Sequence, residues 1–254
     1  MKDTTNHFKA SLHRGDVQIG LWCSLCSEIA AEALSLVGFD WLLFDSEHSP
    51  VEVSGLAPLL RAASGTNTRL AVRPAWNDQT LIKRTLDIGA QNLLLPFVQT
   101  ADEAKQAVSS CRYPPEGVRG VAGATRASKY GFNQSYFSTA NNDVCILVQI
   151  ETTQAIDALP AIASVSGVDG VFVGPSDLAA SMGFLGNPSA PPVQEAIQGA
   201  VGAIKKAGKA PGILAPSVDE AKRYLDWGYQ FAACGVDVRL LTSAASDLNS
   251  SFKT

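Results

Sequence analysis

Short apolar runs alternate along the chain with segments in which apolar residues recur at helical spacing. Runs rich in β-branched residues are typical of strands, and the amphipathic segments between them are typical of helices. The pattern predicts strands over residues 18–24, 39–45, 69–73, 92–97, 145–151, 170–174, 210–215 and 230–235. It predicts helices over residues 27–36, 78–89, 100–111, 152–165, 191–208 and 217–228. Strands that alternate with helices in this way pair in parallel.

Two architectures fit such an alternation: an open doubly wound sheet and a closed barrel. The strands at 41–44 and 146–150 are almost continuously apolar, as strands covered by helices must be. A doubly wound dinucleotide-binding sheet carries a glycine-rich turn after its first strand, but residues 24–27 read Ser-Leu-Cys-Ser. We therefore expect an α/β fold, a (β/α)8 TIM barrel formed as one domain by residues 1–254, with residues 1–17 as a polar lead-in.

The residues at the ends of the predicted helices support this division. Glycine follows four of them, where a helix commonly ends in a left-handed residue; these are Gly38, Gly89, Gly208 and Gly228. Thr100 and Ser217 each precede a helix with an acid three residues later, which is the pattern of a capping box. A long segment, residues 112–143, has no predicted element, and loops of this length are usually functional or disordered.

Composition excludes several classes of protein. The 254 residues include 20 Lys and Arg against 24 Asp and Glu, a net charge of −4, so we expect no nucleic acid partner. No apolar run approaches the roughly 18–20 residues of a membrane span, and residues 1–18 lack the apolar core of a signal peptide. Because the five cysteines are scattered, a reducing, cytoplasmic location without membrane contact is expected.

The active site of such a barrel lies at the carboxyl ends of the strands, and here these ends are unusually polar. They carry Trp22, Asp45, Glu47, His48, Arg73, Gln149, Glu151 and residues 174–177. Carboxylates such as Glu151 and Asp177 are ligands that Mg²⁺ or Mn²⁺ prefers. The alternative, that both only cap the helices they precede, stays open.

Arg73 and His48 add a fixed cation and a proton carrier to the same edge. A guanidinium binds carboxylate or enolate oxygens well, although Arg73 also fits an ordinary salt bridge to a neighbouring acid. His48 transfers protons near neutral pH, and Asp45, Glu47 or Asp87 would orient it.

The positions of the lysines and cysteines further limit the reaction types that this site could catalyse. No lysine follows a strand at this edge, so a Schiff-base mechanism is not expected, and carbonyl chemistry would need a metal as the electrophile. Cys23 and Cys26 have the spacing of half a zinc or redox site, but no second pair matches them. Packing explains these cysteines well enough.

Six segments together resemble the HpcH/HpaI aldolases, which are metal-dependent pyruvate aldolases. These are Gly-Phe-Asp-Trp at 38–41 with Phe-Asp-Ser-Glu-His at 44–48, Val-Arg-Pro at 72–74, Arg-Tyr-Pro-Pro-Glu-Gly-Val-Arg-Gly at 112–120, Val-Gln-Ile-Glu-Thr at 148–152 and Val-Gly-Pro-Ser-Asp-Leu at 173–178. The likeness extends from about residue 18 to the C-terminus. One departure is Ser46, where a small residue, commonly glycine, is expected in the family.

The resemblance implies a set of roles. Glu151 and Asp177 would hold a divalent ion (Mg²⁺, Mn²⁺ or Co²⁺) without an organic cofactor, and Arg73 would bind the keto oxygen of pyruvate. His48 would form a proton-handling dyad with Asp87, and Asp45 would lie nearby, from the same subunit or across an interface. The residues implied in substrate binding are Trp22, Gln149, Gly174, Pro175, Ser176 and Leu214.

The implied reaction converts 4-hydroxy-2-oxo acids to pyruvate and an aldehyde, with 4-hydroxy-2-oxoheptanedioate and succinic semialdehyde as the first choice. A 2-dehydro-3-deoxyglucarate aldolase, a lyase for CoA thioesters and a non-catalytic barrel are the alternatives. The resemblance also implies a homohexamer, a trimer of dimers, in which the last helix packs on a neighbouring subunit. Cations of the long loop would contact a distal carboxylate; these are Arg119, Arg126 and Lys129.

Overall fold

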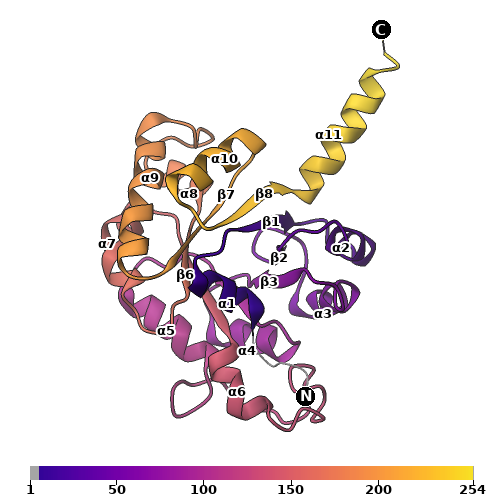
Figure 1. Ribbon diagram of the computed structural model, residues 1–254, viewed down its shortest axis with the longest axis vertical. Helices are drawn as coiled ribbons and strands as arrows, with labels where there is room; N and C mark the ends of the chain where they lie inside the picture. Colours follow the sequence, from indigo (N-terminus) through magenta and orange to yellow (C-terminus); the bar gives the residue numbers. More distant parts are fainter. Residues whose placement is uncertain (1–5, 254) are drawn as a thin grey trace.

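The computed structural model describes residues 6–253 and contains a closed barrel of eight parallel strands (Figure 1). The strands are β1 (Gln18–Cys23), β2 (Trp41–Asp45), β3 (Arg69–Arg73), β4 (Asn92–Leu95), β5 (Cys145–Ile150), β6 (Gly170–Val173), β7 (Ala210–Leu214) and β8 (Phe231–Val236). Each strand pairs with the next along the chain, and β8 pairs with β1. The predicted (β/α)8 barrel is confirmed.

Helices surround the strands and close one end of the barrel. They are α1 (His7–Arg14), α2 (Glu28–Ser35), α3 (Val53–Ala62), α4 (Gln79–Asp87), α5 (Ala101–Cys111), α6 (Tyr136–Asp143), α7 (Thr153–Ala163), α8 (Pro175–Ser181), α9 (Pro191–Lys206), α10 (Val218–Trp227) and α11 (Asp237–Ser250). The hydrophobic pattern predicts α2, α4, α5, α7, α9 and α10. Within residues 6–253, no helix combines the length and apolarity that crossing a bilayer requires.

The predicted helix ends have the expected geometry. All four glycines that follow helices adopt positive φ, from 71° at Gly208 to 103° at Gly38 and Gly228. Thr100 and Glu103 form a complete capping box at the start of α5, and the Ser217 hydroxyl accepts a hydrogen bond from the backbone N–H of Glu220. These local interactions fix where the helices begin and end, and so where the loops between strands and helices start.

Alternation along each strand divides the core into two layers. In β2, Trp41 and Leu43 belong to the cluster inside the barrel, whereas Leu42 and Phe44 pack outward against the helices. Inside, the rings of Trp41 and Phe231 lie 6.0 Å apart. A packed interior of this kind is a solid core and not a channel, so a ligand is confined to the ends of the barrel.

Helix α1 closes the amino-terminal end of the barrel. Its apolar residues Phe8 and Leu12 are buried in the inner cluster, and the Phe8 ring lies 5.8 Å from Trp41 and 6.2 Å from Phe231. On its polar side, His13 Nε2 lies 2.9 Å from Asp169. Residues 6–17 of the predicted polar lead-in thus contain a helix that completes the core, while residues 1–5 lie outside the described residues.

We expect Phe8→Ala to destabilise the protein by about 3–5 kcal/mol, because it removes a large ring from a packed core and leaves a cavity. Phe132→Ala is the control, since Phe132 is 89% exposed and Phe8 is fully buried; its effect should stay within about 0.5 kcal/mol. Urea unfolding of both variants measures the difference. Equal midpoints would show that α1 contributes little to the core.

Candidate active site

A pocket of about 260 Å³ opens at the carboxyl ends of the strands. It is lined by Trp22, Ser24, Asp45, His48, Arg73, Gln149, Glu151, Phe172, Gly174, Pro175, Ser176, Asp177, Leu214 and Val236. Every predicted site residue except Asp87 is among them. A larger hollow, of about 610 Å³, lies around α1 at the other end of the barrel, but it does not bring paired carboxylates and a buried cation together as the smaller pocket does.

Arg73 is fixed in this pocket by two hydrogen bonds to one carboxylate. Its Nε and Nη2 donate to Asp45 Oδ1 and Oδ2 at 2.8 and 2.7 Å, and both residues are buried. The indole of Trp22 donates to Asp45 Oδ2 at 3.2 Å, and its ring lies 4.6 Å from the guanidinium carbon. Burial acts to raise the pKa of Asp45, but its hydrogen bonds and the charge of Arg73 outweigh burial and lower it. Asp45 is therefore charged at neutral pH, and it reaches the site from the same chain.

The other edge of the guanidinium faces the pocket. Arg73 Nη1 lies 2.7 Å from Glu47 Oε2 and 3.5 Å from Gln149 Oε1. Burial raises the pKa of Glu47, and nearby Asp45 and Asp177 add to the increase, while Arg73 opposes it. Sequence reasoning gave Glu47 only a tuning role beside His48.

His48 lies at the mouth of the pocket, with its side chain 66% exposed and Nε2 4.0 Å from Glu47 Oε2. Behind it, the neighbouring Ser46 hydroxyl donates to the backbone carbonyl of Arg73 at 2.8 Å. Ser46 thus ties the end of β2 to the end of β3, which gives the departure from the family pattern a structural role. The arrangement leaves the imidazole free to exchange protons with a bound molecule or with solvent.

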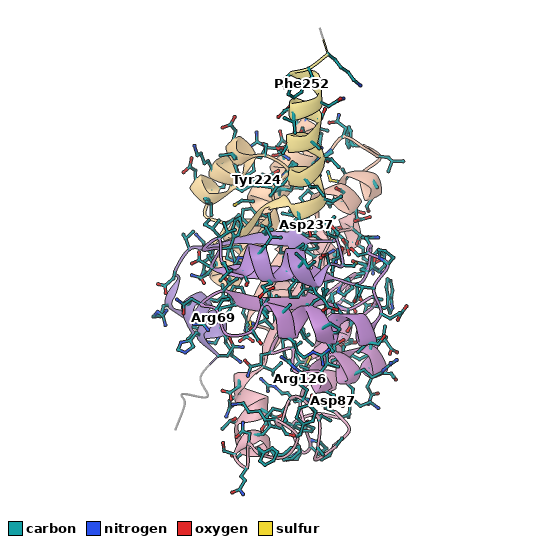
Figure 2. The ribbon with its side chains drawn as sticks, turned by 90° about the vertical axis from the view of Figure 1, so that its right-hand side faces the viewer. Arg69, Asp87, Arg126, Tyr224, Asp237 and Phe252 are labelled. Atoms are coloured by element: carbon teal, nitrogen blue, oxygen red, sulfur yellow. The ribbon has the colours of Figure 1, made fainter. Side chains whose placement is uncertain are left out.

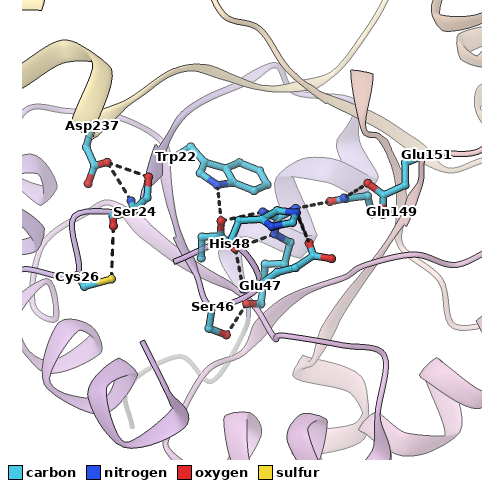
Figure 3. Close-up of polar contacts among 11 residues, drawn as sticks. Trp22, Ser24, Cys26, Ser46, Glu47, His48, Gln149, Glu151 and Asp237 are labelled. Carbon is cyan, nitrogen blue, oxygen red and sulfur yellow. Dashed lines mark hydrogen bonds and ion pairs between the residues drawn. The ribbon is translucent and has the colours of Figure 1, made fainter. Parts of the chain in front are cut away.

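Glu151 is buried on the opposite side and held by two donors. Gln149 Nε2 donates to its Oε2 at 2.5 Å, which is the contact that Figure 3 shows. The backbone N–H of Phe97, which the figure does not draw, donates to its Oε1 at 3.0 Å. Phe97 has a φ of 55°, which is rare for a bulky residue. Burial raises the pKa of Glu151 to about 7, and the charges of Glu47 and Asp177 add to this effect. The sequence pattern could not indicate Phe97, since its contribution is a backbone conformation.

These carboxylates fit a divalent cation. The charges of Glu47 and Asp177 raise the pKa of Glu151, and a cation bound by Glu151 and Asp177 would offset this repulsion. A Cβ on Gly174 would lie 2.7 Å from Glu151 Oε2, so glycine is what allows the carboxylate to occupy its place. Within residues 6–253, no three His, Cys, Asp or Glu side chains cluster closely enough to enclose a metal. A metal ion held only by Glu151 and Asp177 would therefore keep coordination positions for water and substrate, as is usual for Mg²⁺.

Helix α8 begins at the same place, with Gly174 as its N-cap and Pro175 in its first turn. Proline is tolerated there because the first N–H groups of a helix have no partner within the helix. The first-turn N–H groups at residues 176 and 177 can thus serve the carboxylate of a ligand. Leu214, Phe172 and Val236 give the pocket an apolar wall.

The predicted contact between His48 and Asp87 is absent from the chain. Helix α4 begins after β3 and runs back along the barrel, so Asp87 lies near the start of β4. Two residues later, Gly89 lines a hollow with His7 and Arg69, at the amino-terminal end. There Asp87 accepts a hydrogen bond from Arg119 Nη2 at 2.8 Å. Within one chain, Asp87 therefore lies at the end of the barrel opposite to His48, and the dyad stays a prediction.

The long loop is ordered and does not reach the pocket of its own chain. Arg119 is buried against the Tyr113 ring, with its guanidinium carbon 4.4 Å from the ring centre, and Arg126 donates to the carbonyl of Ile88 at 2.8 Å. Both arginines are thus used within the chain. All five cysteines, including Cys23 and Cys26, are free.

Comparison with known proteins agrees with this geometry. The family model described as HpcH/HpaI aldolase/citrate lyase matches residues 18–244. The 5-keto-4-deoxy-D-glucarate aldolase of Klebsiella pneumoniae subsp. pneumoniae is 51% identical over 248 residues, which are 98% of this chain and 97% of that protein. The 4-hydroxy-2-oxo-heptane-1,7-dioate aldolase of Shigella sonnei is also 51% identical over 248 residues, 97% of this chain and 95% of that protein.

A solved structure extends the agreement to the fold. The crystal structure of an HpcH/HpaI aldolase/citrate lyase family protein from Burkholderia cenocepacia J2315 superimposes with a TM-score of 0.96 at 39% identity, covering 98% of this chain and all of that one (100%). Relatives at about half identity over nearly the whole chain are carbon–carbon lyases. The chain therefore belongs to the HpcH/HpaI aldolase/citrate lyase family and is an aldolase.

Proposed function

We propose that the chain is a divalent-metal-dependent aldolase that cleaves and forms 4-hydroxy-2-oxo acids, with pyruvate and an aldehyde as the products of cleavage. The observation that carries this proposal is one pocket lined by the fixed guanidinium of Arg73 together with the carboxylates Glu151 and Asp177. A cation and a carboxylate-rich metal site on one side of a small cavity are suited to binding a 2-oxo acid and stabilising its enolate.

The substrates in the names of the two relatives support this choice of substrate class. Numbered from its keto end, 5-keto-4-deoxy-D-glucarate has a 2-oxo group, a CH₂ at C3 and a hydroxyl at C4, and 4-hydroxy-2-oxo-heptane-1,7-dioate has the same unit. Cleavage between C3 and C4 releases pyruvate in both cases. The remaining aldehyde carries a second carboxylate. We place the heptanedioate type first, with succinic semialdehyde as the aldehyde, and the deoxyglucarate type second.

Glu151 and Asp177 would hold the metal, which supplies a Lewis acid that polarises the 2-oxo group. Arg73 offsets the negative charge that grows on the 2-oxo oxygen, because Asp45 holds its guanidinium in place before the substrate arrives. As the C3–C4 bond breaks, its electron pair forms the enolate and the C4 hydroxyl loses a proton. His48 receives this proton at the mouth of the pocket, and protonation at C3 then gives pyruvate.

A second copy of the chain would be needed for the predicted dyad. His48 and Asp87 lie at opposite ends of the barrel, so they can meet only between two copies. Helix α11 also points to an assembly, since it leaves the barrel (Figure 2) and exposes Val238, Leu241 and Leu248 along its length. We propose that α11 packs on a neighbouring copy in a homohexamer.

Co-expression of His48→Ala and Asp87→Ala chains tests the shared dyad. Each variant alone should lose about 10²-fold or more in turnover, as expected for a group that handles a proton. In a random mixture about a quarter of the sites would combine an intact His48 from one copy with an intact Asp87 from another. Activity should therefore recover to roughly that fraction.

The matched control co-expresses His48→Ala chains with Arg73→Lys chains. Because His48 and Arg73 belong to the pocket of the same chain, every pocket in this mixture lacks one of them, and activity should not recover. The absence of recovery in the first mixture would remove Asp87 from the mechanism.

Cleavage of 4-hydroxy-2-oxo acids tests the proposed reaction itself. Purified protein is freed of metal with EDTA, supplied with Mg²⁺, Mn²⁺ or Co²⁺, and given the heptanedioate or deoxyglucarate substrate, with pyruvate release coupled to lactate dehydrogenase. We expect pyruvate only when a metal is present. Equal release with EDTA would contradict the metal dependence, and no release from either substrate would contradict the substrate class.

A further inference from the structure

Asp237 connects three parts of the molecule that meet beside the pocket. It is the first residue of α11 and is only 4% exposed, although the rest of that helix is exposed. Its Oδ1 accepts hydrogen bonds from the backbone N–H of Ser24 at 2.9 Å and of Val238 at 2.7 Å. Its Oδ2 accepts one from the backbone N–H of Leu25 at 3.1 Å, and Figure 3 shows the contacts of Asp237 with Ser24. One side chain thus binds the segment after β1 to the junction of β8 and α11.

This carboxylate is held by N–H and hydroxyl groups and not by a cation. The Ser24 hydroxyl lies 3.3 Å from Oδ1, and none of the ion pairs within residues 6–253 includes Asp237. Burial raises the pKa of the Cys23 and Cys26 thiols, and the charge of Asp237 raises it further. A charge in such a place would be costly without its hydrogen bonds. The bonds to residues 24 and 25 are therefore strong constraints on that segment.

Pairing between β1 and β8 is interrupted just before these bonds. Gly20 pairs with Ala233, but Trp22 pairs with Val236, so the strands advance by different numbers of residues. Gly235 lies in the interruption with a φ of 151°, in the left-handed half of the map. Bulges of this kind re-aim side chains near active sites. The pairing resumes at Trp22 and Val236, and the Asp237 carboxylate then holds the segment directly after β1 to the end of β8.

The segments that Asp237 joins are walls of the pocket. Ser24 and Val236 both line it, and Trp22 lies two residues before Ser24. The groups on the other side are held differently: Asp45 fixes Arg73, while Gln149 and Phe97 fix Glu151. A change at Asp237 should thus move Ser24 and Val236, whereas Trp22 stays held by its hydrogen bond to Asp45 and the metal and guanidinium side stays in place.

We propose that Asp237 is a positioning residue that sets the wall of the pocket facing the aldehyde. This inference rests on the proposed function, because that function assigns the Arg73 and Glu151 side to pyruvate and leaves the opposite wall to the aldehyde. The same carboxylate forms the base of α11, so the helix that we place on a neighbouring subunit is linked to the shape of the pocket. The Asp237 carboxylate then contributes both to subunit assembly, through α11, and to binding of the aldehyde, through the wall of the pocket.

The test compares Asp237→Ala and Asp237→Asn in the full-length protein, with Asp247→Ala on the exposed face of the same helix as control. Asparagine keeps an acceptor for Ser24 but presents a donor to the N–H of Leu25, so its effects should be intermediate. Three quantities are measured: backbone amide exchange over residues 22–27, metal-dependent deuterium exchange of the pyruvate methyl group, and KM and kcat for the aldehyde in the condensation direction.

In Asp237→Ala we expect faster amide exchange at residues 24 and 25 by about tenfold or more. The value of kcat/KM for the aldehyde should fall by about tenfold or more, mainly through KM, because a displaced wall misplaces the acceptor. Pyruvate exchange should stay within about twofold of wild type. The control should match wild type throughout.

Two results would overturn the proposal. Unchanged amide exchange in Asp237→Ala and Asp237→Asn would show that the carboxylate does not hold the wall. An equal loss of pyruvate exchange and aldehyde condensation would show a general structural defect and not control of the acceptor side. If wild-type protein fails to exchange pyruvate protons with any metal, the proposed function fails, and the assignment of this wall to the aldehyde fails with it.

Discussion

Replacing Arg73 by lysine should lower kcat for cleavage by about 10²–10³-fold while leaving metal affinity within about twofold of wild type. Lysine keeps a positive charge opposite Asp45 and Glu47, so the variant avoids two buried, unpaired carboxylates. Lysine lacks the planar guanidinium group. In the wild type this group binds both oxygens of Asp45 and also presents a further N–H edge to the substrate. Steady-state cleavage and Mn²⁺ binding measure the two effects separately.

Arg69→Lys is the matched control, because Arg69 begins the strand that Arg73 ends and lies at the opposite end of the barrel. It should leave both kcat and metal affinity unchanged. A rate for Arg73→Lys close to that of Arg69→Lys would mean that a simple charge suffices. The role of the fixed guanidinium would then be wrong.

Glu151→Gln should weaken Mn²⁺ binding by about 100-fold or more, since it removes a charged ligand and not only a supporting group. The wild-type protein should also bind Mn²⁺ more weakly as the pH falls below 7. Burial raises the pKa of Glu151 to about 7 in the metal-free protein, so below that pH a proton must leave before the metal can bind. Calorimetric titrations at pH 8, 7 and 6 measure both effects.

The variant lacks this titrating group, so its weak binding should change less between pH 7 and pH 6 than binding to wild type. Glu116→Gln, in the long loop and 52% exposed, serves as the control and should match wild type at each pH. Wild-type affinity in Glu151→Gln would show that the metal binds elsewhere.

Much of the barrel could be predicted because its strands are short, continuous and apolar. Residues 69–73 were expected as a strand and form β3 with the same bounds, and most other strands differ from expectation by one or two residues at an end. Helix α3 was missed because Gly55 and Pro58 interrupt its pattern. Helix α1 was treated as a polar lead-in because only Phe8 and Leu12 mark its buried face, and their burial depends on contacts distant in sequence.

The sequence predicts those features of the site that follow from the order and direction of the strands alone. Parallel strands place their carboxyl ends at one edge, so Arg73 and Glu151 could be expected near each other from the sequence. Contacts that depend on backbone geometry could not be expected, such as the N–H of Phe97 on Glu151 or the carboxylate of Asp237 on Ser24. The place of Asp87 at the other end of the barrel could not be expected either, because its role came from a resemblance, which does not say to which subunit's pocket a residue contributes.

Hydrogen–deuterium exchange tests most directly whether this pocket enolises pyruvate with the help of a divalent metal. The methyl group of pyruvate is followed by NMR in D₂O with protein freed of metal by EDTA and then given Mg²⁺ or Mn²⁺. The experiment needs no knowledge of the aldehyde. We predict exchange that appears only when both protein and metal are present and that is lost in Glu151→Gln. Absence of exchange with every metal tested, or equal exchange without metal, would contradict the account.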